Sequence, residues 1–332
     1  MKKANYYHSY PGKKVQCLLC PNKCMISPDK KGFCDIRQNK NGVLYNSIYN
    51  AYSSIAVDPI EKKPLYHFYP GSQILSLGSI GCNFKCRHCQ NWQISQPGRN
   101  SVKREMQCIE PEEILNMTTK YYLDMVAFTY NEPNINFETI FEAAKLLKNN
   151  DKKVVSVTNG YVCLEPLAEL MPYIDAYSID LKAFTDKAYT KLTGVNAKEN
   201  VQQVIDFLVK KEKHIELVWN LVTDINTDLG QIEEAFDWVA SLSKYIPFHI
   251  TVFFPNLDFA DKMPVPGDVV SAATCLAKEK GLKYVYSSSS EDTLCPNCNF
   301  YLIKRRHFQI IENNTAGKIC KNCHKVIPWF IN

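Results

Sequence analysis

Short apolar runs alternate with longer amphipathic stretches between about residues 72 and 290. Six of the runs have the length and the β-branched or apolar composition of buried strands: 74–77, 125–129, 154–157, 176–179, 216–219 and 249–253. Between them, apolar residues recur at helical spacing near 111–122, 135–149, 164–171, 199–213, 228–244 and 268–280. Six βα units in this order predict an α/β fold, namely a partial (β/α)6 TIM-like barrel built on a parallel sheet.

A polar segment follows each predicted strand. In chain order these segments are Gly81-Cys82, Tyr130–Pro133, Thr158–Tyr161, Asp180–Lys182, Asn220–Asp224 and Phe254-Pro255. In a parallel βα barrel the carboxyl ends of the strands share one face, which builds the active site. Because such loops are polar in any case, this pattern alone leaves an ordinary solvated rim open as the alternative.

Composition narrows the class of protein. The chain has 332 residues, of which 45% are hydrophobic and 22% charged, and no apolar run reaches the roughly 18 residues of a membrane-spanning helix. The basic start, Met1 to His8, is followed by no apolar segment, so we expect no signal peptide and a cytoplasmic location. A net charge of +5 is too small to indicate a dedicated nucleic-acid binder.

The 14 cysteines fall into three groups that divide the chain. A reducing compartment favours metal binding or catalysis over disulfides. We therefore expect a cysteine-rich N-terminal extension over 1–70, a barrel over 71–290 and a zinc-ribbon-like tail over 291–332. Cys108, Cys163 and Cys275 stand alone, and the helical stretch around Cys275 predicts a core position for it.

The middle group has the spacing Cys-x-x-x-Cys-x-x-Cys, at Cys82, Cys86 and Cys89. Three thiolates on one loop hold three corners of a 4Fe-4S cluster and leave one iron with an open position. An open position binds a substrate or cosubstrate, as it does in catalytic zinc sites. The alternatives are three core cysteines, or a zinc loop that a distant residue completes.

These residues resemble the radical S-adenosylmethionine (SAM) superfamily, whose cluster loop follows the first strand of a partial barrel. The resemblance implies that Cys82, Cys86 and Cys89 bind a 4Fe-4S cluster and that SAM binds its open iron, to be cleaved to a 5'-deoxyadenosyl radical that abstracts hydrogen. The segment Tyr130-Asn131-Glu132-Pro133 looks like the superfamily's motif that receives the methionine ammonium. A plain alternative for Glu132 is a carboxylate at a helix N-terminus next to Pro133.

Further segments narrow the resemblance. Thr158-Asn159-Gly160 and Asp180-Leu181-Lys182 are similar to segments of the glycyl-radical-enzyme activases (the relatives of pyruvate formate-lyase activating enzymes), which implies that Asn159, Asp180 and Lys182 also contact SAM. The run Asp58 to Leu65, with Cys17 to Cys24 and Gln90-Asn91-Trp92, resembles the AmmeMemoRadiSam-type radical proteins over nearly the whole chain. Assignment to the superfamily implies an oxidoreductase that receives electrons from a flavodoxin- or ferredoxin-like donor.

The two outer groups each hold four cysteines. Cys295, Cys298, Cys320 and Cys323 form two knuckles with the spacing of a structural zinc site, which we favour over a catalytic site or a second iron–sulfur site. The basic residues between the knuckles, Lys304 to His307, would contact RNA or an acidic partner, or form a solvated face. Cys17, Cys20, Cys24 and Cys34 are expected to bind zinc or an auxiliary cluster, and thiolate chemistry alone does not choose between them.

The substrate stays open. An activase would act on a glycine of a partner protein, whereas another modifying enzyme would take a small molecule in a closed pocket. A protein substrate or a Memo-like partner is compatible with the resemblance, and no membrane or nucleic-acid partner is expected. From other classes, a zinc- and RNA-binding protein and an electron-transfer protein are the rival hypotheses.

Overall fold

The computed structural model describes residues 1–99, 105–287 and 291–331. Its centre is an eight-stranded sheet with the order β16-β15-β14-β13-β12-β11-β9-β8. The seven strands from β9 to β16 are parallel, and β8 is antiparallel to β9 at one edge. The bounds are β8 Ser54–Pro59, β9 Gln73–Gly78, β11 Met125–Phe128, β12 Lys153–Thr158, β13 Ala176–Asp180, β14 His214–Leu221, β15 Phe248–Val252 and β16 Val285–Tyr286.

All six predicted strands are present in this sheet, and the predicted α/β class with a parallel sheet is confirmed. Across the described ranges the outermost strands, β8 and β16, do not pair with each other, so the sheet is open, as in a partial barrel. These two edge strands were not predicted. β16 is only two residues long, and β8 lies in the segment that the sequence assigned to the extension.

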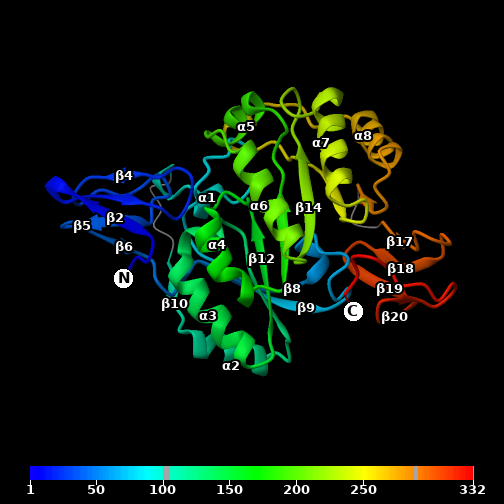
Figure 1. Ribbon diagram of the computed structural model, residues 1–332, viewed down its shortest axis with the longest axis horizontal. Helices are drawn as coiled ribbons and strands as arrows, with labels where there is room; N and C mark the ends of the chain where they lie inside the picture. Colours follow the sequence, from blue (N-terminus) through cyan, green and yellow to red (C-terminus); the bar gives the residue numbers. More distant parts are fainter. Residues whose placement is uncertain (100–104, 288–290, 332) are drawn as a thin grey trace.

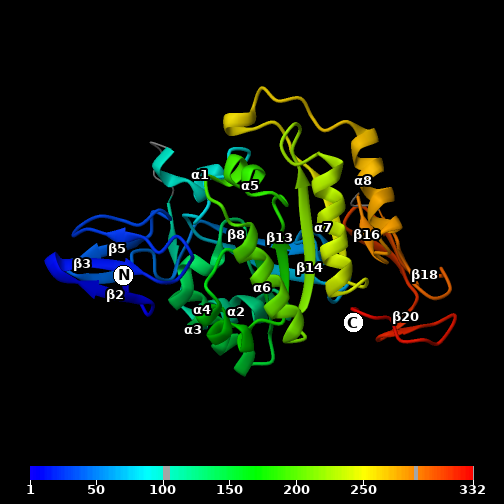
Figure 2. The same cartoon turned by 45° about the horizontal axis from the view of Figure 1, so that its top comes forward.

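Helices connect the strands in the predicted order. They are α1 Trp92–Ser95, α2 Pro111–Lys120, α3 Phe137–Asn149, α4 Leu164–Leu170, α5 Asp186–Thr193, α6 Lys198–Lys210, α7 Leu229–Leu242 and α8 Gly267–Glu279, with short 3-10 helices η1 Pro11–Lys13, η2 Ile60–Lys62, η3 Pro97–Arg99, η4 Pro133–Asn136, η5 Met171–Tyr173 and η6 Leu257–Phe259. From α3 to α8 the longer helices follow along the sheet in the order of its strands (Figure 2).

Local sequence sets several helix ends. A reciprocal capping box between Glu110 and Glu113, with Pro111 in the first turn, starts α2 where the sequence predicts it. The unpredicted α5 has only eight residues, which is too short to show clear helical spacing of apolar residues. The Thr185 side chain caps its start, and Gly194 in the left-handed region ends it.

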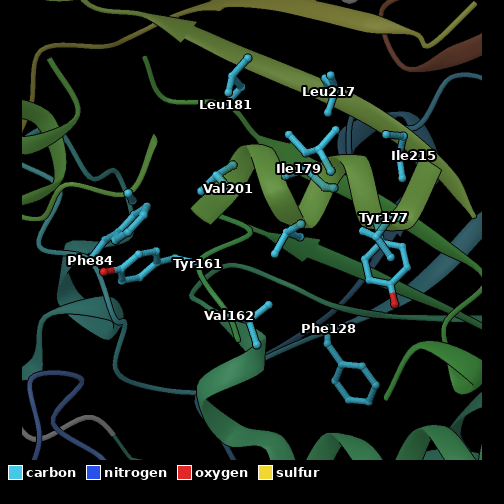
Figure 3. Packing of buried hydrophobic residues seen from close by; sticks show 14 of the residues in the cluster. Phe84, Phe128, Tyr161, Val162, Tyr177, Ile179, Leu181, Val201, Ile215 and Leu217 are labelled. Carbon is cyan, nitrogen blue, oxygen red and sulfur yellow. The ribbon is translucent and has the colours of Figure 1, made fainter. Parts of the chain in front are cut away.

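The main core lies between the sheet and its helices. Figure 3 shows members of this cluster from three strands and one helix: Phe128 of β11, Tyr177 and Ile179 of β13, Leu217 of β14 and Val201 of α6. Phe84 and Tyr161 belong to loops at the carboxyl ends of β9 and β12 and lie in the same cluster. Their ring centroids are 5.2 Å apart. The loops at this edge of the sheet therefore share the packing that holds the strands together.

The N-terminal segment forms a small module at one end of the molecule (Figures 1 and 2). It has two three-stranded sheets and a short β7–β10 pair, with β1 Lys2–Lys3, β2 Tyr7–Tyr10, β3 Lys14–Cys17, β4 Met25–Ile26, β5 Arg37–Lys40, β6 Val43–Asn46, β7 Ala51–Tyr52 and β10 Gln107–Cys108. Arg37 anchors this module to the α/β domain, because its Nη1 forms a buried ion pair of 2.8 Å with Glu138 and its Nε donates to the Ile135 carbonyl.

The module also packs against the loop after β9. Gly81 has a φ of +84°, and a Cβ at this position would lie 2.4 Å from the carbonyl oxygen of Cys34. Both the left-handed backbone and the close approach require glycine here.

The C-terminal tail lies at the opposite end of the long axis from the module (Figure 1). Its strands are β17 Thr293–Leu294, β18 Tyr301–Arg306, β19 Gln309–Asn313, β20 Thr315–Ala316 and β21 Ile319–Cys320. The tail shares a buried cluster with Tyr66, Tyr284 and Tyr286, and Arg305 donates from Nη2 to the Tyr66 carbonyl. Residues 288–290, where the predicted boundary with the barrel falls, lie outside the described residues. In the part of the chain that the structure describes, no helix is both long and apolar enough to cross a membrane.

A buried polar network supports the end of the sheet that contacts the tail. The Glu216 carboxylate accepts backbone N–H bonds from Tyr66 and His67 and contacts the Nε2 atoms of His214 and His249. His67 contacts the Tyr286 hydroxyl through Nε2 at 2.6 Å, and burial lowers the pKa of His67 to about 3. His67 is therefore neutral in the folded chain at neutral pH.

This burial predicts a pH-dependent stability. Because the pKa of His67 is near 6.5 in the unfolded chain, its contribution is complete above pH 6.5 and decreases as the pH falls toward about 3. We expect a slope of up to about 1.4 kcal/mol per pH unit from this residue between those limits. Unfolding of the His67→Gln variant between pH 7.5 and 5 should show a smaller slope than the wild type. The control is His8→Gln, because His8 is exposed. If His67→Gln had the same slope of unfolding free energy against pH as the wild type, the assignment would be contradicted.

The packing of the module predicts a strong effect at Gly81. Gly81→Ala should lower the free energy of unfolding by about 1–3 kcal/mol through the strained backbone conformation alone. The loss should exceed that range because the new Cβ also meets the Cys34 carbonyl. Gly267→Ala is the control, since nothing lies within 4 Å of a Cβ there. Denaturant titration measures both variants, and equal stabilities would argue against this contact.

Candidate functional site

A cavity of about 420 Å³ lies at the carboxyl ends of the parallel strands. The loops after β9, β11, β12 and β13 line it, as the barrel prediction requires. The structure brings all eight sequence-predicted residues of the central site to this cavity: Cys82, Cys86, Cys89, Asn131, Glu132, Asn159, Asp180 and Lys182.

Backbone hydrogen bonds hold the cysteine loop in place. The N–H of Gly81 donates to the carbonyl of Ile94, and the N–H groups of Lys85 and Arg87 donate to the last turn of α5, at Thr193 and Leu192. The helix that the sequence analysis missed is therefore a support for this loop. The signal that could have found it is the pair of caps, Thr185 and Gly194.

The three thiols are free of disulfides and face one cavity. Cys82 Sγ accepts from the Phe84 N–H at 3.4 Å and lies 3.7 Å from Asn159 Nδ2, and Cys89 Sγ lies 3.2 Å from the Ser95 hydroxyl. Burial raises the pKa of Cys86 to about 12, and the charge of the nearby Lys182 opposes this rise, which favours the thiolate that a cluster requires. Among the described residues that line the cavity there are three cysteines and no fourth, and three thiols fit a 4Fe-4S cluster with one open iron.

Glu132 is buried, and protein donors already hold its carboxylate. Oε1 accepts from the backbone and side chain of Asn134 and from the Thr158 hydroxyl, whereas Oε2 accepts from the Asn159 N–H at 2.8 Å. Glu132 thus caps η4, which is the helix-terminus alternative that its position before Pro133 suggested. Burial raises its pKa. Oε2 accepts only this one hydrogen bond from the described residues, so it can accept another from a molecule in the cavity.

The side chain of Asn131 joins two strand ends. Its Nδ2 donates to the Gly81 carbonyl at 2.9 Å and to the Ser79 hydroxyl, and its Oδ1 accepts from the Ser79 N–H. These bonds fix the segment that leads into Cys82. Asn131 therefore positions the cysteine loop as well as lining the cavity.

Asp180 and Lys182 form an ion pair of 2.5 Å at the end of β13. Burial alone would lower the pKa of Lys182, but the Asp180 carboxylate and the Cys86 thiol raise it above its ordinary value. Lys182 is consequently a protonated donor close to the cysteine loop. Together the pair presents one cation and one anion to any bound molecule.

Several residues that line the same cavity have no role in the sequence-based prediction, among them Lys62, Lys63 and Asn91. Asp58 binds both lysines, at 2.9 and 2.6 Å, and accepts from the Tyr130 hydroxyl at 2.6 Å. The run from Asp58 to Leu65 was noticed only as a family resemblance. The alternating charges of this run could have indicated a functional role. The pairing of β8 with β9 then places the run at the cavity.

The outer cysteines lie away from this cavity. Cys295 and Cys323 are 3.7 Å apart between sulfurs, Cys298 and Cys320 are 3.8 Å apart, and all four Sγ atoms lie within 4.8 Å of one another. The N-terminal four, Cys17, Cys20, Cys24 and Cys34, line a separate enclosed pocket in the module.

Two of the isolated cysteines also have clear positions. Cys275 is exposed on α8, so its predicted core position is wrong: the buried residues of that helix, Ala273 and Ala277, lie on another face. Cys163 is half-buried beside Pro21 and Lys23, outside the central cavity.

Comparison with known proteins identifies the family. Residues 77–239 match the Radical SAM superfamily. An uncharacterized protein of Methanocaldococcus jannaschii, MJ0808, is 37% identical over 98% of this chain and 99% of its own length. A second protein of that organism, named as a glycyl-radical enzyme activating enzyme, is 27% identical over 66% of this chain and 80% of its own length.

Solved structures share the fold at low identity. Streptococcus suis SuiB bound to its precursor peptide SuiA is 14% identical, with a TM-score of 0.51 over 69% of this chain and 51% of that chain. A radical SAM methyltransferase from Sphaerobacter thermophilus is 13% identical, with a TM-score of 0.50 over 70% of this chain and 71% of that chain. The predicted superfamily is confirmed: this chain belongs to the radical SAM superfamily, whose members are enzymes that use S-adenosylmethionine and a 4Fe-4S cluster.

Proposed function

We propose that this enzyme cleaves SAM reductively at a 4Fe-4S cluster bound by Cys82, Cys86 and Cys89, and abstracts hydrogen from its substrate. The observation that carries the proposal is the convergence of three free thiols with Glu132, Asp180 and Lys182 on one cavity. When bound, the cluster and SAM supply one-electron cleavage of the sulfonium to a 5'-deoxyadenosyl radical. The protein supplies binding, orientation and exclusion of water.

The polar residues have complementary tasks in this proposal. The Lys182 ammonium is suited to a carboxylate, and Glu132 Oε2 and Asp180 are suited to an ammonium or a hydroxyl, so a zwitterion such as the methionine part of SAM finds both partners. Asn159 donates to Cys82 and to the Asn83 side chain, and Asn131 holds the loop from the other side. These bonds keep the donor groups in a fixed geometry before any ligand arrives.

An adjoining cavity of about 240 Å³ is the place we propose for the substrate. It shares Cys86, Cys89 and the Asp180–Lys182 pair with the first cavity and extends to Asn220, Thr251 and Phe254 beyond β14 and β15. Phe254 is 65% exposed at the rim. A radical formed beside the cysteine loop would thus have direct access to a molecule over these two strands.

A second candidate function is activation of a glycyl-radical enzyme, in which the substrate is a glycine of a partner protein. It is supported by the relatives named as activating enzymes and by the exposed rim at Phe254. Electron paramagnetic resonance would detect a stable glycyl radical on such a partner after incubation with SAM and a reductant. In either function the electron comes from a flavodoxin- or ferredoxin-like carrier in the cytoplasm.

We further propose that Cys295, Cys298, Cys320 and Cys323 bind a structural zinc ion. Sulfur separations of 3.7 and 3.8 Å are those of a tetrahedron with zinc–sulfur bonds of about 2.3 Å. Four ligands leave no open position for catalysis. The site lies in the tail, which packs at the opposite end of the strands from the central cavity.

The first of two predictions from this function tests the central site. Cys86→Ala should reduce formation of 5'-deoxyadenosine by at least about 100-fold, because two thiolates do not retain the cluster. The assay is chromatography of 5'-deoxyadenosine after anaerobic reconstitution with iron and sulfide, then addition of dithionite and SAM. Cys275→Ala is the matched control, since that thiol is exposed on α8. Wild-type rates in Cys86→Ala would refute the assignment.

The second prediction tests the tail. Cys298→Ser should lose about one zinc per chain and lower the melting temperature, because metal binding contributes folding free energy. Metal analysis and thermal unfolding measure both effects, with exposed Cys108→Ser as the control. Formation of 5'-deoxyadenosine at 20 °C should change less than about twofold. An unchanged zinc content would show that these thiols do not bind the ion.

A further inference from the structure

We propose that Cys17, Cys20, Cys24 and Cys34 bind a second iron–sulfur cluster, through which electrons reach the central one. The relay rests on the proposed function, whereas the metal site itself does not. The site lies in the N-terminal module, between β3 and the start of β5.

The fold brings the four thiols to one enclosed pocket. Apolar residues, including Leu19, Ile26 and Ile135, complete its wall, and none of the four cysteines is in a disulfide. Backbone bonds from Cys17 N–H to the Cys24 carbonyl, and from Lys23 N–H to the Cys20 carbonyl, fold the segment so that three of the thiols gather. Cys34 joins them from the next turn. Such convergence of free thiols in an apolar pocket is the usual setting of a metal centre.

The sulfurs of the N-terminal group do not have the close spacing of a single tetrahedral ion site. In the described ranges, 1–99, 105–287 and 291–331, the C-terminal four are the only group of three or more possible ligands whose atoms all lie within 4.8 Å. No three of the N-terminal thiols are that close together, and neither are the three of the central loop. The ligands of a four-iron cube are farther apart than those of one tetrahedral ion, because each binds a different iron.

A buried cation without a full set of partners points to the same pocket. Arg37 is 2% exposed and lines the pocket, and its Nη2 has no hydrogen-bond partner among the described residues. Its Nε and Nη1 are already bound to Ile135 and Glu138. A buried N–H group without an acceptor is costly, and four cysteine thiolates around a cluster carry net negative charge. A bound cluster would supply the missing acceptor.

Direct contacts connect this pocket to the central cysteine loop. The Cys34 carbonyl lies against Gly81, which immediately precedes Cys82. Asn22 Nδ2 donates to the Asn83 carbonyl at 3.2 Å, and Asp35 forms an ion pair of 2.6 Å with Lys85. Each contact joins Cys34, or a residue within two positions of one of the four cysteines, to the segment from Gly81 to Cys86. The two thiol sets are therefore adjacent in space.

Four cysteine ligands leave no iron open to a substrate, so this cluster would exchange electrons only. In the relay, a low-potential one-electron carrier loses one electron, the N-terminal cluster accepts it and passes it on, and the central cluster is reduced by one electron. No bond forms or breaks. The carrier would be acidic, because residues 1–46 hold eight lysines, all exposed, against two aspartates.

Metal analysis of four proteins tests the site: wild type, Cys20→Ala, Cys82→Ala and Cys163→Ala, the last a matched control beside the pocket. After anaerobic reconstitution we expect about eight irons and eight sulfides in the wild type and the control, and about four in each of the other variants. If only the central assignment is wrong, Cys82→Ala will contain as much iron as the wild type, whereas Cys20→Ala will lose its iron.

A wild type with about four irons and two zinc ions per chain would overturn the proposal, and so would Cys20→Ala with wild-type iron. The first result comes from the wild type alone, and the second needs only the Cys20→Ala variant. Spin counting on dithionite-reduced protein is a further check, with about two spins expected per chain in the wild type and about one in Cys82→Ala.

Stopped-flow reduction tests the relay. With reduced flavodoxin as the donor, the central cluster of Cys20→Ala should be reduced at least tenfold more slowly than that of the wild type or of Cys163→Ala. With dithionite, a small diffusible reductant, the rates should agree within about twofold. Equal rates with flavodoxin would show that electrons reach the central site by another route.

Discussion

The side chain of Asn131 connects the two strand ends on which the whole site depends. Its three hydrogen bonds to Ser79 and Gly81 join the end of β11 to the end of β9, one residue before Cys82. The same turn carries Glu132, whose carboxylate accepts from Asn159 at the end of β12. Because each amide and carboxylate satisfies buried backbone groups, the loops of three strands are held in a single arrangement. The three thiols consequently face one cavity before a cluster binds.

The two outer cysteine groups lie at opposite ends of the molecule (Figure 1), so the metal centres proposed for them would have different tasks. The tail contacts the amino ends of β14 and β15, around Glu216, far along the strands from the cavity. Its compact sulfurs suit a single ion that stabilises a short segment. The N-terminal module contacts the cysteine loop itself through Gly81, Asn83 and Lys85. A metal centre there would be coupled to the reaction, whereas one in the tail would support the fold.

Charges around the cavity are balanced within the protein. Asp58 binds Lys62 and Lys63, and Asp180 binds Lys182, so each cation at the wall has a fixed anionic partner. Such pairs lose little freedom when a ligand binds, because they are already ordered. The arrangement suits a ligand that carries both charges, and in the proposed function the exposed Phe254 ring would contact the substrate.

The sequence by itself determined the succession of βα units, because strand and helix periodicity are local properties of the chain, and it found the three central cysteines by their spacing. The resemblance to the superfamily implied the five polar residues at the cavity, and the meeting of strand ends in a parallel sheet predicted that they converge with the cysteines. The sequence missed α5, whose eight residues are too short for a periodic signal, and it gave Lys63 no role. Only the tertiary structure decided that the Glu132 carboxylate accepts from Asn159 at the end of β12, that Cys275 faces away from the core, and that the N-terminal thiols lie beside Gly81. These features follow from the packing of segments far apart in the chain, which a local sequence pattern does not encode.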